Sequence, residues 1–285
     1  MAEAVIERTL HRTTTFRLAE FWCPPDNPRW RTPNIMPEAP HVVFPQTSAI
    51  IRHVGDEPTL ANPNHVMFYN PGQRYFRTLH HPAGDHCWFL ELEPTLLAEL
   101  IHPGEFRFVS GPGEPYVRLL LHAIVRHLAY DSADRLLVEE RVIEALSRTV
   151  AAAAHRHQAV RPRTKPEHRG LVERAKSVLT ETVTEPMSLQ DIARRLHTSE
   201  YHLARVFRAG TGHSLHQYRN HLRLRLALDQ LADPDTKLSA LACSLGYASH
   251  SHFTDSFRTV FGIPPSRVRG SIDRGLLGDL RRGPV

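Results

Sequence analysis

The chain has 285 residues, of which 41% are hydrophobic and 23% charged, as in a globular protein large enough for two domains. It contains no apolar run of the roughly 20 residues that a membrane-spanning helix needs, and its first ten residues lack the apolar core of a signal peptide. Three widely spaced cysteines give no disulfide framework, so we expect a cytoplasmic protein.

The net charge of +5 is unevenly distributed along the chain. Residues 1–160 contain 15 Arg, no Lys and 18 acidic residues, a net charge of −3. Residues 161–285 contain 20 basic and 12 acidic residues, a net charge of +8. The asymmetry predicts that the C-terminal part meets a polyanion.

Residues 10 to about 110 are predicted to be β-rich. Short apolar runs alternate there with Pro, Gly and Asn, a pattern that favours a sandwich or a barrel. The runs are residues 41–45, 48–54, 65–70, 87–93 and 106–110. Aromatic side chains in this part either fill the core or line a ligand cavity, and we expect mostly core. They are Trp22, Trp30, Phe44, Phe68, Tyr69, Tyr75 and Trp88.

From Tyr116 the apolar spacing becomes helical and is broken once, at "YDSAD". We assign residues 1–114 to the β domain and 115–158 to a helical hairpin. The hairpin packs either on the β domain or on a second copy of itself, and we adopt dimerisation. A polar, proline-bearing linker is expected at 159–170, a helical domain at 171–270 and a flexible tail at 271–285.

The helical domain contains one unit twice. "LQDIARRLHTSEYHLARVFRAGTG" aligns with "LSALACSLGYASHSHFTDSFRTVFG" at an offset of 49, which becomes 50 after one inserted residue. Each copy predicts a short helix, a tight turn and a second helix that begins at a serine N-cap, a helix-turn-helix arrangement. Gly246 suits the second turn, whereas His197 in the first would need a positive φ.

One helix is predicted between the two copies. Ser214 caps it and Pro234 ends it, which gives about eighteen residues, or roughly 27 Å. Two helices held at this separation match successive major-groove segments, which lie about 34 Å apart on one face of DNA.

The segment "GYASHSHFTDSFRTVFGIPPSRVR" resembles the C-terminal signature of the AraC/XylS-type bacterial transcriptional regulators. The resemblance covers about 171–269, and the β-rich part is more loosely similar to the cupin-like sensor barrels of such proteins. It implies an α+β, two-domain fold: a cupin-like β-barrel with a helical hairpin, then an all-α domain with two helix-turn-helix motifs joined by a long helix. It further implies a sequence-specific, nucleoid-associated regulator. No Ser/His/Asp order, glycine-rich phosphate loop or C-x-x-C spacing appears in the sequence, so we expect no enzymatic activity and no resident cofactor.

The partners expected from this resemblance are double-stranded DNA, a small-molecule effector in the barrel, a second copy of the chain and RNA polymerase. Helix position and resemblance together assign base contacts in the second helix of each unit, from Tyr201, Ala204, Arg205, His250, Ser251 and Asp255. Arg205 is the strongest of these, because arginine can bind guanine bidentately; a phosphate contact is its alternative role. Asp255 either accepts from cytosine or caps locally. Arg208, Arg219 and Arg258 are assigned to phosphates, which position the protein without specifying sequence.

The stretch "TLHHPAGDHCW" gathers the metal-ligand types His80, His81, Asp85, His86 and Cys87 within eight residues. The His-x-His spacing of metal cupins is missing, and alternation would point His86 and Cys87 to opposite faces of a strand, so we expect no metal site. Two alternatives stay open. One is a metal-dependent cupin enzyme with a helical interaction module; the other is an architectural DNA binder with a structural barrel. The sequence leaves operator, effector and direction of regulation open.

Overall fold

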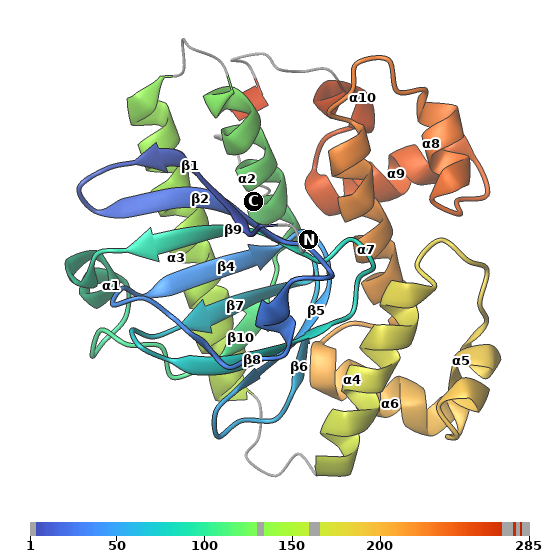
Figure 1. Ribbon diagram of the computed structural model, residues 1–285. Coiled ribbons are helices and arrows are strands. Elements are labelled where there is room, and N and C mark those ends of the chain that lie inside the picture. Colours follow the sequence, from blue (N-terminus) through green and yellow to red (C-terminus); the bar gives the residue numbers. More distant parts are fainter. Residues whose placement is uncertain (1–3, 130–133, 160–165, 270–275, 278–279, 281–285) are drawn as a thin grey trace. The chain divides into compact units, whose positions relative to one another are not determined.

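The computed structural model describes residues 4–129, 134–159, 166–269, 276, 277 and 280 (Figure 1). The chain divides into two compact units, residues 1–113 with 147–160, and residues 114–146 with 161–285. Strands dominate the first unit and helices make up the second, so the α+β class is confirmed. No helix in the described ranges is both long and apolar enough to cross a membrane.

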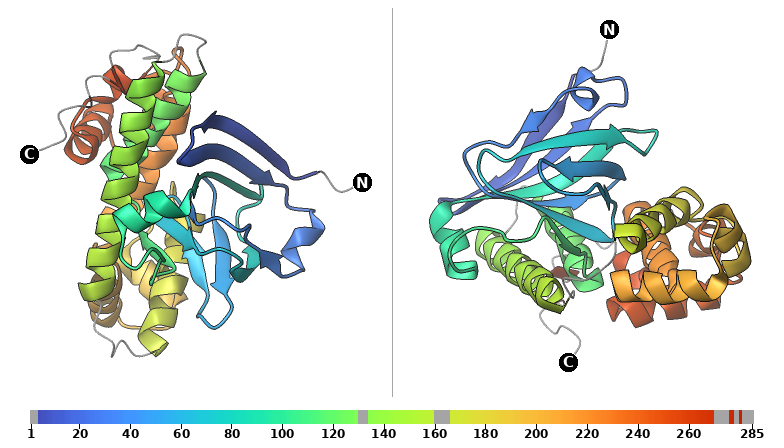
Figure 2. Two further views of the ribbon diagram at one scale, coloured as in Figure 1. Left: turned by 90° about the vertical axis from the view of Figure 1, so that its left-hand side faces the viewer. Right: turned by 90° about the horizontal axis from the view of Figure 1, so that it is seen from below.

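The first unit contains two antiparallel sheets. The six-stranded sheet has the order β1-β2-β9-β4-β7-β10, and the four-stranded sheet has the order β3-β8-β5-β6. The hairpin of β1 and β2 forms one edge of the larger sheet and is seen in both views of Figure 2. The strands are β1 (Ile6–Arg12), β2 (Phe16–Cys23), β3 (Asn34–Ile35), β4 (His41–Pro45), β5 (Ala49–His53), β6 (Thr59–Ala61), β7 (His65–Tyr69), β8 (Arg74–Leu79), β9 (Asp85–Leu92) and β10 (Ser110–Pro112).

The two sheets share one apolar core. Ile51 of the smaller sheet and Met67 and Tyr69 of the larger sheet belong to the same buried cluster. Pairing stops at β1 and β10 in one sheet and at β3 and β6 in the other, so the described strands form no closed barrel. The cupin-like barrel expected from the sequence is therefore not confirmed.

Four of the five apolar runs predicted as strands contain one, and the fifth is a correction. In residues 106–110 only Ser110 enters a strand, while Phe106 and Phe108 pack their rings against Phe68. A second correction is the short helix α1 (Pro94–Leu100), in a part predicted to contain no helix. Pro94 at its first turn has the backbone angle that a helix start needs and no N–H to leave unpaired. A 3-10 turn, η1, covers Pro28–Trp30.

The second unit consists of packed helices. The hairpin helix α2 packs against α7 and α9 within this unit, and most of its side chains are buried. Helix α3 continues from the second unit into the first. The helices are α2 (Pro115–Leu128), α3 (Arg135–Ala159), α4 (Pro166–Glu181), α5 (Leu189–Arg195), α6 (Glu200–Thr211), α7 (Leu215–Gln230), α8 (Leu238–Ser244), α9 (His250–Phe261) and α10 (Pro265–Val268).

The predicted boundaries need adjustment near the linker and the tail. Helix α4 begins at Pro166, inside the range 159–170 predicted as a linker, and residues 160–165 lie outside the described residues. Within the range predicted as a flexible tail, Leu276, Leu277 and Leu280 are buried, and the Tyr116 hydroxyl donates to the Leu280 carbonyl (2.7 Å). The rest of 271–285 is not described.

Candidate nucleic-acid interface and ligand cavity

Helices α5–α6 and α8–α9 form the two predicted helix-turn-helix units. The second helix of each begins at a serine whose hydroxyl accepts from the backbone N–H three residues on, at 3.2 Å for Ser199 and 3.1 Å for Ser249. Each ends at a glycine with positive φ, 82° at Gly212 and 78° at Gly262. The offset of 50 therefore relates the caps as well as the sequence, and both predicted N-caps are confirmed.

The turns inside the two units differ in one residue type. His197 has a φ of 53°, as its alignment with Gly246 predicts, and Gly246 has a φ of 76°. A side chain in this region is strained, which glycine avoids. The first helix-turn-helix unit therefore keeps the turn geometry with a residue type, histidine, that is less suited to it.

Buried phenylalanines fix the inner face of each helix. Phe207 in α6 and Phe253 and Phe257 in α9 have no exposed surface, and Phe261 is 3% exposed. The rings of Phe253, Phe257 and Phe261 contact one another in sequence at centroid distances of 5.8 and 4.6 Å. Because these faces are fixed inward, the opposite face of each helix points to solvent.

The outer face of α6 presents an aromatic ring and two cations. Tyr201 is 78% exposed, and Arg205 and Arg208 follow it at helical spacing, both exposed. An exposed aromatic residue beside arginines, at the first turns of the second helix, is typical of a DNA-contacting surface. Ala204 is only half-exposed and packs against the core, so the surface it offers is small.

The outer face of α9 is polar and internally paired. His250, Ser251, Asp255 and Arg258 are all exposed. Asp255 accepts from Arg258 one turn later (3.4 Å), and the His250 ring lies 3.4 Å from the Thr254 hydroxyl. The pairing of Asp255 with Arg258 reduces the positive charge that this helix presents.

The long helix α7 joins the two helix-turn-helix units, as predicted, and begins at Ser214 with a capping box. Its Arg219 points inward, where Nη1 donates to the Met187 carbonyl just before α5 (3.1 Å), and burial lowers the pKa of its guanidinium. This contact differs from the phosphate role that the sequence suggested for Arg219. The recurring His202 and His252 each stack edge-on with another ring, that of His168 and that of Tyr247.

A family model described as a helix-turn-helix domain matches residues 192–271. The multiple antibiotic resistance protein MarA of Escherichia coli is 30% identical over 91 residues, which are 32% of this chain and 72% of MarA. This chain belongs to the AraC/XylS-type family of transcriptional regulators.

Further similarities were found to one more curated relative and to solved structures. The regulatory protein SoxS of Salmonella typhimurium is 28% identical over 102 residues, which are 36% of this chain and 95% of SoxS. Among solved structures, unsaturated fatty acid-bound ToxT of Vibrio cholerae is 13% identical and matches with a TM-score of 0.39 over 90% of this chain and 95% of ToxT. An AraC-type regulator of Chromobacterium violaceum is 25% identical, with a TM-score of 0.36 over 39% of this chain and 98% of its own. The curated relatives are transcriptional regulators, and this AraC/XylS-type chain is a DNA-binding one.

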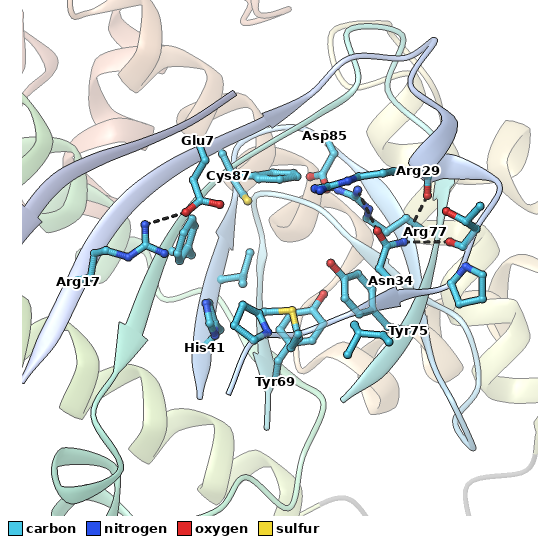
Figure 3. Close-up of a pocket in the computed structure, with 18 residues that line it drawn as sticks. Glu7, Arg17, Arg29, Asn34, His41, Tyr69, Tyr75, Arg77, Asp85 and Cys87 are labelled. Atoms are coloured by element: carbon cyan, nitrogen blue, oxygen red, sulfur yellow. Dashed lines mark hydrogen bonds and ion pairs between the residues drawn. The ribbon is translucent and has the colours of Figure 1, made fainter. Parts of the chain in front are cut away.

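This AraC/XylS-type regulator also has a cavity of about 450 Å³ in its strand-rich unit, residues 1–113 with 147–160 (Figure 3). Strands of both sheets line it, and a mixed set of aromatic and polar side chains faces it. Among them are Phe21, Asn34, His41, Tyr69, Tyr75, Arg77, Cys87 and Phe89. Of the aromatic residues considered as cavity walls from the sequence, only Tyr69 and Tyr75 line this space.

Two of the three arginines that line the cavity, Arg17 and Arg77, are held in ion pairs. At one side Arg17 donates to Glu7 (2.7 Å) and Glu91 (2.5 Å); at the other Arg77 donates to Asp85 (2.9 Å). Burial lowers the pKa of His41 and raises that of Tyr75 to about 12, so both are neutral at pH 7. A neutral histidine and neutral phenols among paired charges can donate and accept hydrogen bonds without adding net charge.

The histidine–cysteine cluster of the sequence does not come together. His80 contacts the Ser48 hydroxyl (2.8 Å), His81 accepts from the Ala83 N–H (3.1 Å) and His86 contacts Glu20 (2.9 Å). Cys87 is buried on the cavity side of β9, so His86 and Cys87 do point to opposite faces. Over the described ranges, no three His, Cys, Asp or Glu side chains are grouped as metal ligands.

Sequence reasoning missed most of the cavity, whose lining comes from seven strands and connecting segments. It also missed three polar residues: Asn220 and Arg223 of α7 and Tyr247 in the turn between α8 and α9. Their hydrogen bonds connect α7 to that turn. The only local signal was the aromatic residue after Gly246 in the family signature.

Proposed function

We propose that this regulator places α6 and α9 in two successive major-groove segments on one face of DNA. The observation that carries the proposal is the repeated geometry: two capped helices with fixed inner faces and exposed polar outer faces, in one compact unit. Their connecting helix α7 has 16 residues, about 24 Å at 1.5 Å per residue. That length suits two recognition helices that enter adjacent groove segments.

Helix α6 carries most of the base discrimination in this proposal. Arg205 is exposed and no ion pair to it is found in the described part of the chain, so its guanidinium can bind the O6 and N7 of a guanine. Tyr201 contacts bases beside it, and Ala204 offers at most its methyl group to a thymine. Arg208, near the end of the helix, contacts phosphate.

Helix α9 makes weaker and more local contacts. His250 and Ser251 lie in its first turn, where a recognition helix meets base edges. Asp255 can accept from a cytosine amino group, but its pairing with Arg258 competes with that contact. Arg258 contacts a phosphate once it leaves Asp255.

The test is binding of the purified protein to DNA upstream of its own coding sequence, compared with a random duplex at one salt concentration. Arg205→Ala should weaken binding to the own site by about 1–3 kcal/mol, roughly 5- to 150-fold, and change binding to the random duplex little. The control is Arg174→Ala, which removes the same charge at an exposed position on α4, outside the two recognition helices. Equal losses on both duplexes would instead make Arg205 a phosphate contact, and equal wild-type affinity for both would favour an architectural binder.

The cavity is the proposed site of a small-molecule effector. Its volume lies in the range of small-molecule sites, and its wall combines aromatic faces with a few polar groups. Compounds that raise the melting temperature of the wild type should fail to do so with Met36→Trp, because Met36 is half-buried at the cavity wall and tryptophan would occupy the space. Stabilisation that persists in Met36→Trp would place the compound elsewhere.

Dimerisation through the hairpin and contact with RNA polymerase remain proposals. Much of α2 is covered by α7 and α9, which leaves α3 as the hairpin's contribution to a second copy. Leu136, near the start of α3, is 68% exposed and is suited to an apolar contact. Sedimentation of the wild type and of Leu136→Asp distinguishes a dimer held there from a monomer.

A further inference from the structure

Arg223, in the middle of α7, contacts both the backbone segment that leads into the first helix-turn-helix unit and the turn of the second. Its Nε donates to the Val183 carbonyl (2.6 Å), and its Nη2 lies 3.5 Å from the Glu185 carbonyl. Val183 and Glu185 belong to the segment that joins α4 to α5 and leads into the first helix-turn-helix unit. Its Nη1 donates to the Gly246 carbonyl (3.0 Å), in the turn of the second unit. One guanidinium therefore connects the segment that leads into one recognition unit with the turn of the other.

Neighbouring side chains strengthen this connection from both sides. The Tyr247 hydroxyl donates to the Asn220 side-chain carbonyl (2.7 Å), and the Arg223 guanidinium lies 5.8 Å from the centre of the Tyr247 ring. Arg219, one turn before Arg223, donates to the Met187 carbonyl of the first unit (3.1 Å). The same face of α7 thus contacts the α4–α5 segment, which leads into the first helix-turn-helix unit, and the turn of the second unit.

The fit around Arg223 leaves no room for a side chain at residue 246. A Cβ on Gly246 would lie 2.6 Å from the Thr184 carbonyl oxygen and 2.8 Å from Nη2 of Arg223. Gly246 is therefore required for two reasons, its positive φ and this close approach. The turn of the second helix-turn-helix unit can approach the Thr184 carbonyl this closely because residue 246 has no side chain.

Arginine is the residue type that this arrangement needs. Its planar guanidinium carries five donors in a fixed geometry, so it can serve several carbonyls in one plane, whereas a lysine ammonium is a single point of donation. The three carbonyls lie in a turn and a loop, so they do not accept the regular backbone hydrogen bonds of a helix or a strand. Loss of Arg223 would leave them to water and remove the fixed geometry between the two segments.

We propose that Arg223 is a positioning residue that sets the orientation of α6 relative to α9, and so the spacing of the two DNA segments that the protein recognises. The consequence for DNA binding rests on the proposed function above; the structural consequence does not. Two rigidly connected units bind a correctly spaced pair of segments with the orientation already fixed. Without the connection, each unit keeps its own contacts but the pair loses its preferred spacing.

The first experiment measures the structural consequence without DNA. Nitroxide labels are placed at Ala209→Cys and Thr259→Cys, two exposed residues on α6 and α9, in a Cys243→Ser background, since Cys243 is the exposed native cysteine among the described residues. Pulsed electron paramagnetic resonance should give one narrow distance distribution in the Arg223-containing protein. Arg223→Ala should broaden it, Arg223→Lys should broaden it less, and Arg174→Ala should leave it unchanged. An unchanged distribution in Arg223→Ala would overturn the proposal.

The second experiment measures DNA affinity on three duplexes: the footprinted own site, the same site with the α9 segment scrambled, and the same site with two base pairs inserted between the segments. Arg223→Ala should lose about tenfold or more on the intact site and less than about twofold on the scrambled one. The insertion should weaken the wild type much more than the variant. Equal losses on all three duplexes would overturn the proposal. Failure of the proposed function would show differently, as a wild type that does not distinguish the intact site from random DNA.

Both experiments need variants that fold like the wild type, so the fold of each variant is checked first. The circular dichroism and melting transition of Arg223→Ala are compared with those of the wild type. If the alanine variant does not fold, Arg223→Lys gives the same comparison with the stem and charge retained. Tyr247→Phe, which removes only the hydroxyl that contacts Asn220, should move the distance distribution and the spacing dependence in the same direction by a smaller amount.

Discussion

Helices α6 and α9 have the same scaffold and different outer faces. Both begin at a capping serine, end at a glycine with positive φ and bury phenylalanine at the matching position, Phe207 and Phe257. Three pairs of outward-facing residues assigned to DNA lie 50 residues apart, and two of these pairs differ. The pairs are Tyr201 and Ser251, Arg205 and Asp255, and Arg208 and Arg258.

This difference separates what folding requires from what recognition requires. The caps and the rings of Phe207 and Phe257 satisfy the same backbone and packing demands in both copies, so they are the same residues. The outer faces carry no such demand. Helix α6 presents an aromatic ring and two arginines, whereas α9 presents a paired aspartate and arginine. We infer that discrimination between DNA sequences is concentrated in α6.

The largest effect should come from removing the shared part of the scaffold. Phe207→Ala and Phe257→Ala each delete a fully buried ring, and each should cost about 3–5 kcal/mol of unfolding free energy. Because both belong to the same compact unit, the two losses should be similar. Denaturant unfolding followed by circular dichroism measures them.

The control for these two variants is Tyr201→Ala, whose side chain is 78% exposed. It should change the unfolding free energy by less than about 0.5 kcal/mol. A cost for Phe257→Ala far below that for Phe207→Ala would show that the two copies are not equivalent in folding.

A smaller effect should follow from removing the charge that distinguishes α9. Asp255→Asn keeps the shape of the side chain and releases Arg258 from its ion pair (3.4 Å). Affinity for any duplex should rise by about threefold, and the salt dependence of binding should steepen by about one counterion. Titrations at several salt concentrations on the own site and on a random duplex measure both.

The same substitution tests whether Asp255 contacts a base. A loss of affinity on the own site, together with a gain on random DNA, would show that the carboxylate accepts a hydrogen bond from a base. The matched control is Asp191→Asn. Asp191 is an acidic residue of the first helix-turn-helix unit that belongs to the capping box of α5 and pairs with Arg194.

The sequence predicted the repeated helices because their signals are local. Ser199 and Ser249 lie just before their helices, and the phenylalanines of α9 recur every four residues, so helix starts and inner faces follow from spacing alone. The positive φ of His197 was predictable for the same reason, since Gly246 occupies the matching position.

Contacts between distant segments could not be predicted in this way. Arg219 and Arg223 look like the other arginines of a basic helix, and only the fold shows that they contact carbonyls 32 and 40 residues earlier. The run 106–110 has the composition of a strand, yet Phe106 and Phe108 pack on Phe68 outside any sheet. The cavity depends on side chains from both sheets, whose pairing order has no signature within a single strand.

The smallest expected effect concerns the turn in which the two units differ. His197 has a φ of 53° and is exposed, so glycine there removes backbone strain without removing a buried contact. The relief, about 1 kcal/mol, is partly offset by the greater freedom of glycine in the unfolded chain, which leaves a gain of about 0.5 kcal/mol. His197→Gly should therefore raise the melting temperature by about 1–2 °C. Gly246→Ala should lower it, because its Cβ would meet the Thr184 carbonyl and Arg223. A lower melting temperature for His197→Gly would mean that the histidine contributes a contact that outweighs its strain, and the two turns would then differ by more than their residue type.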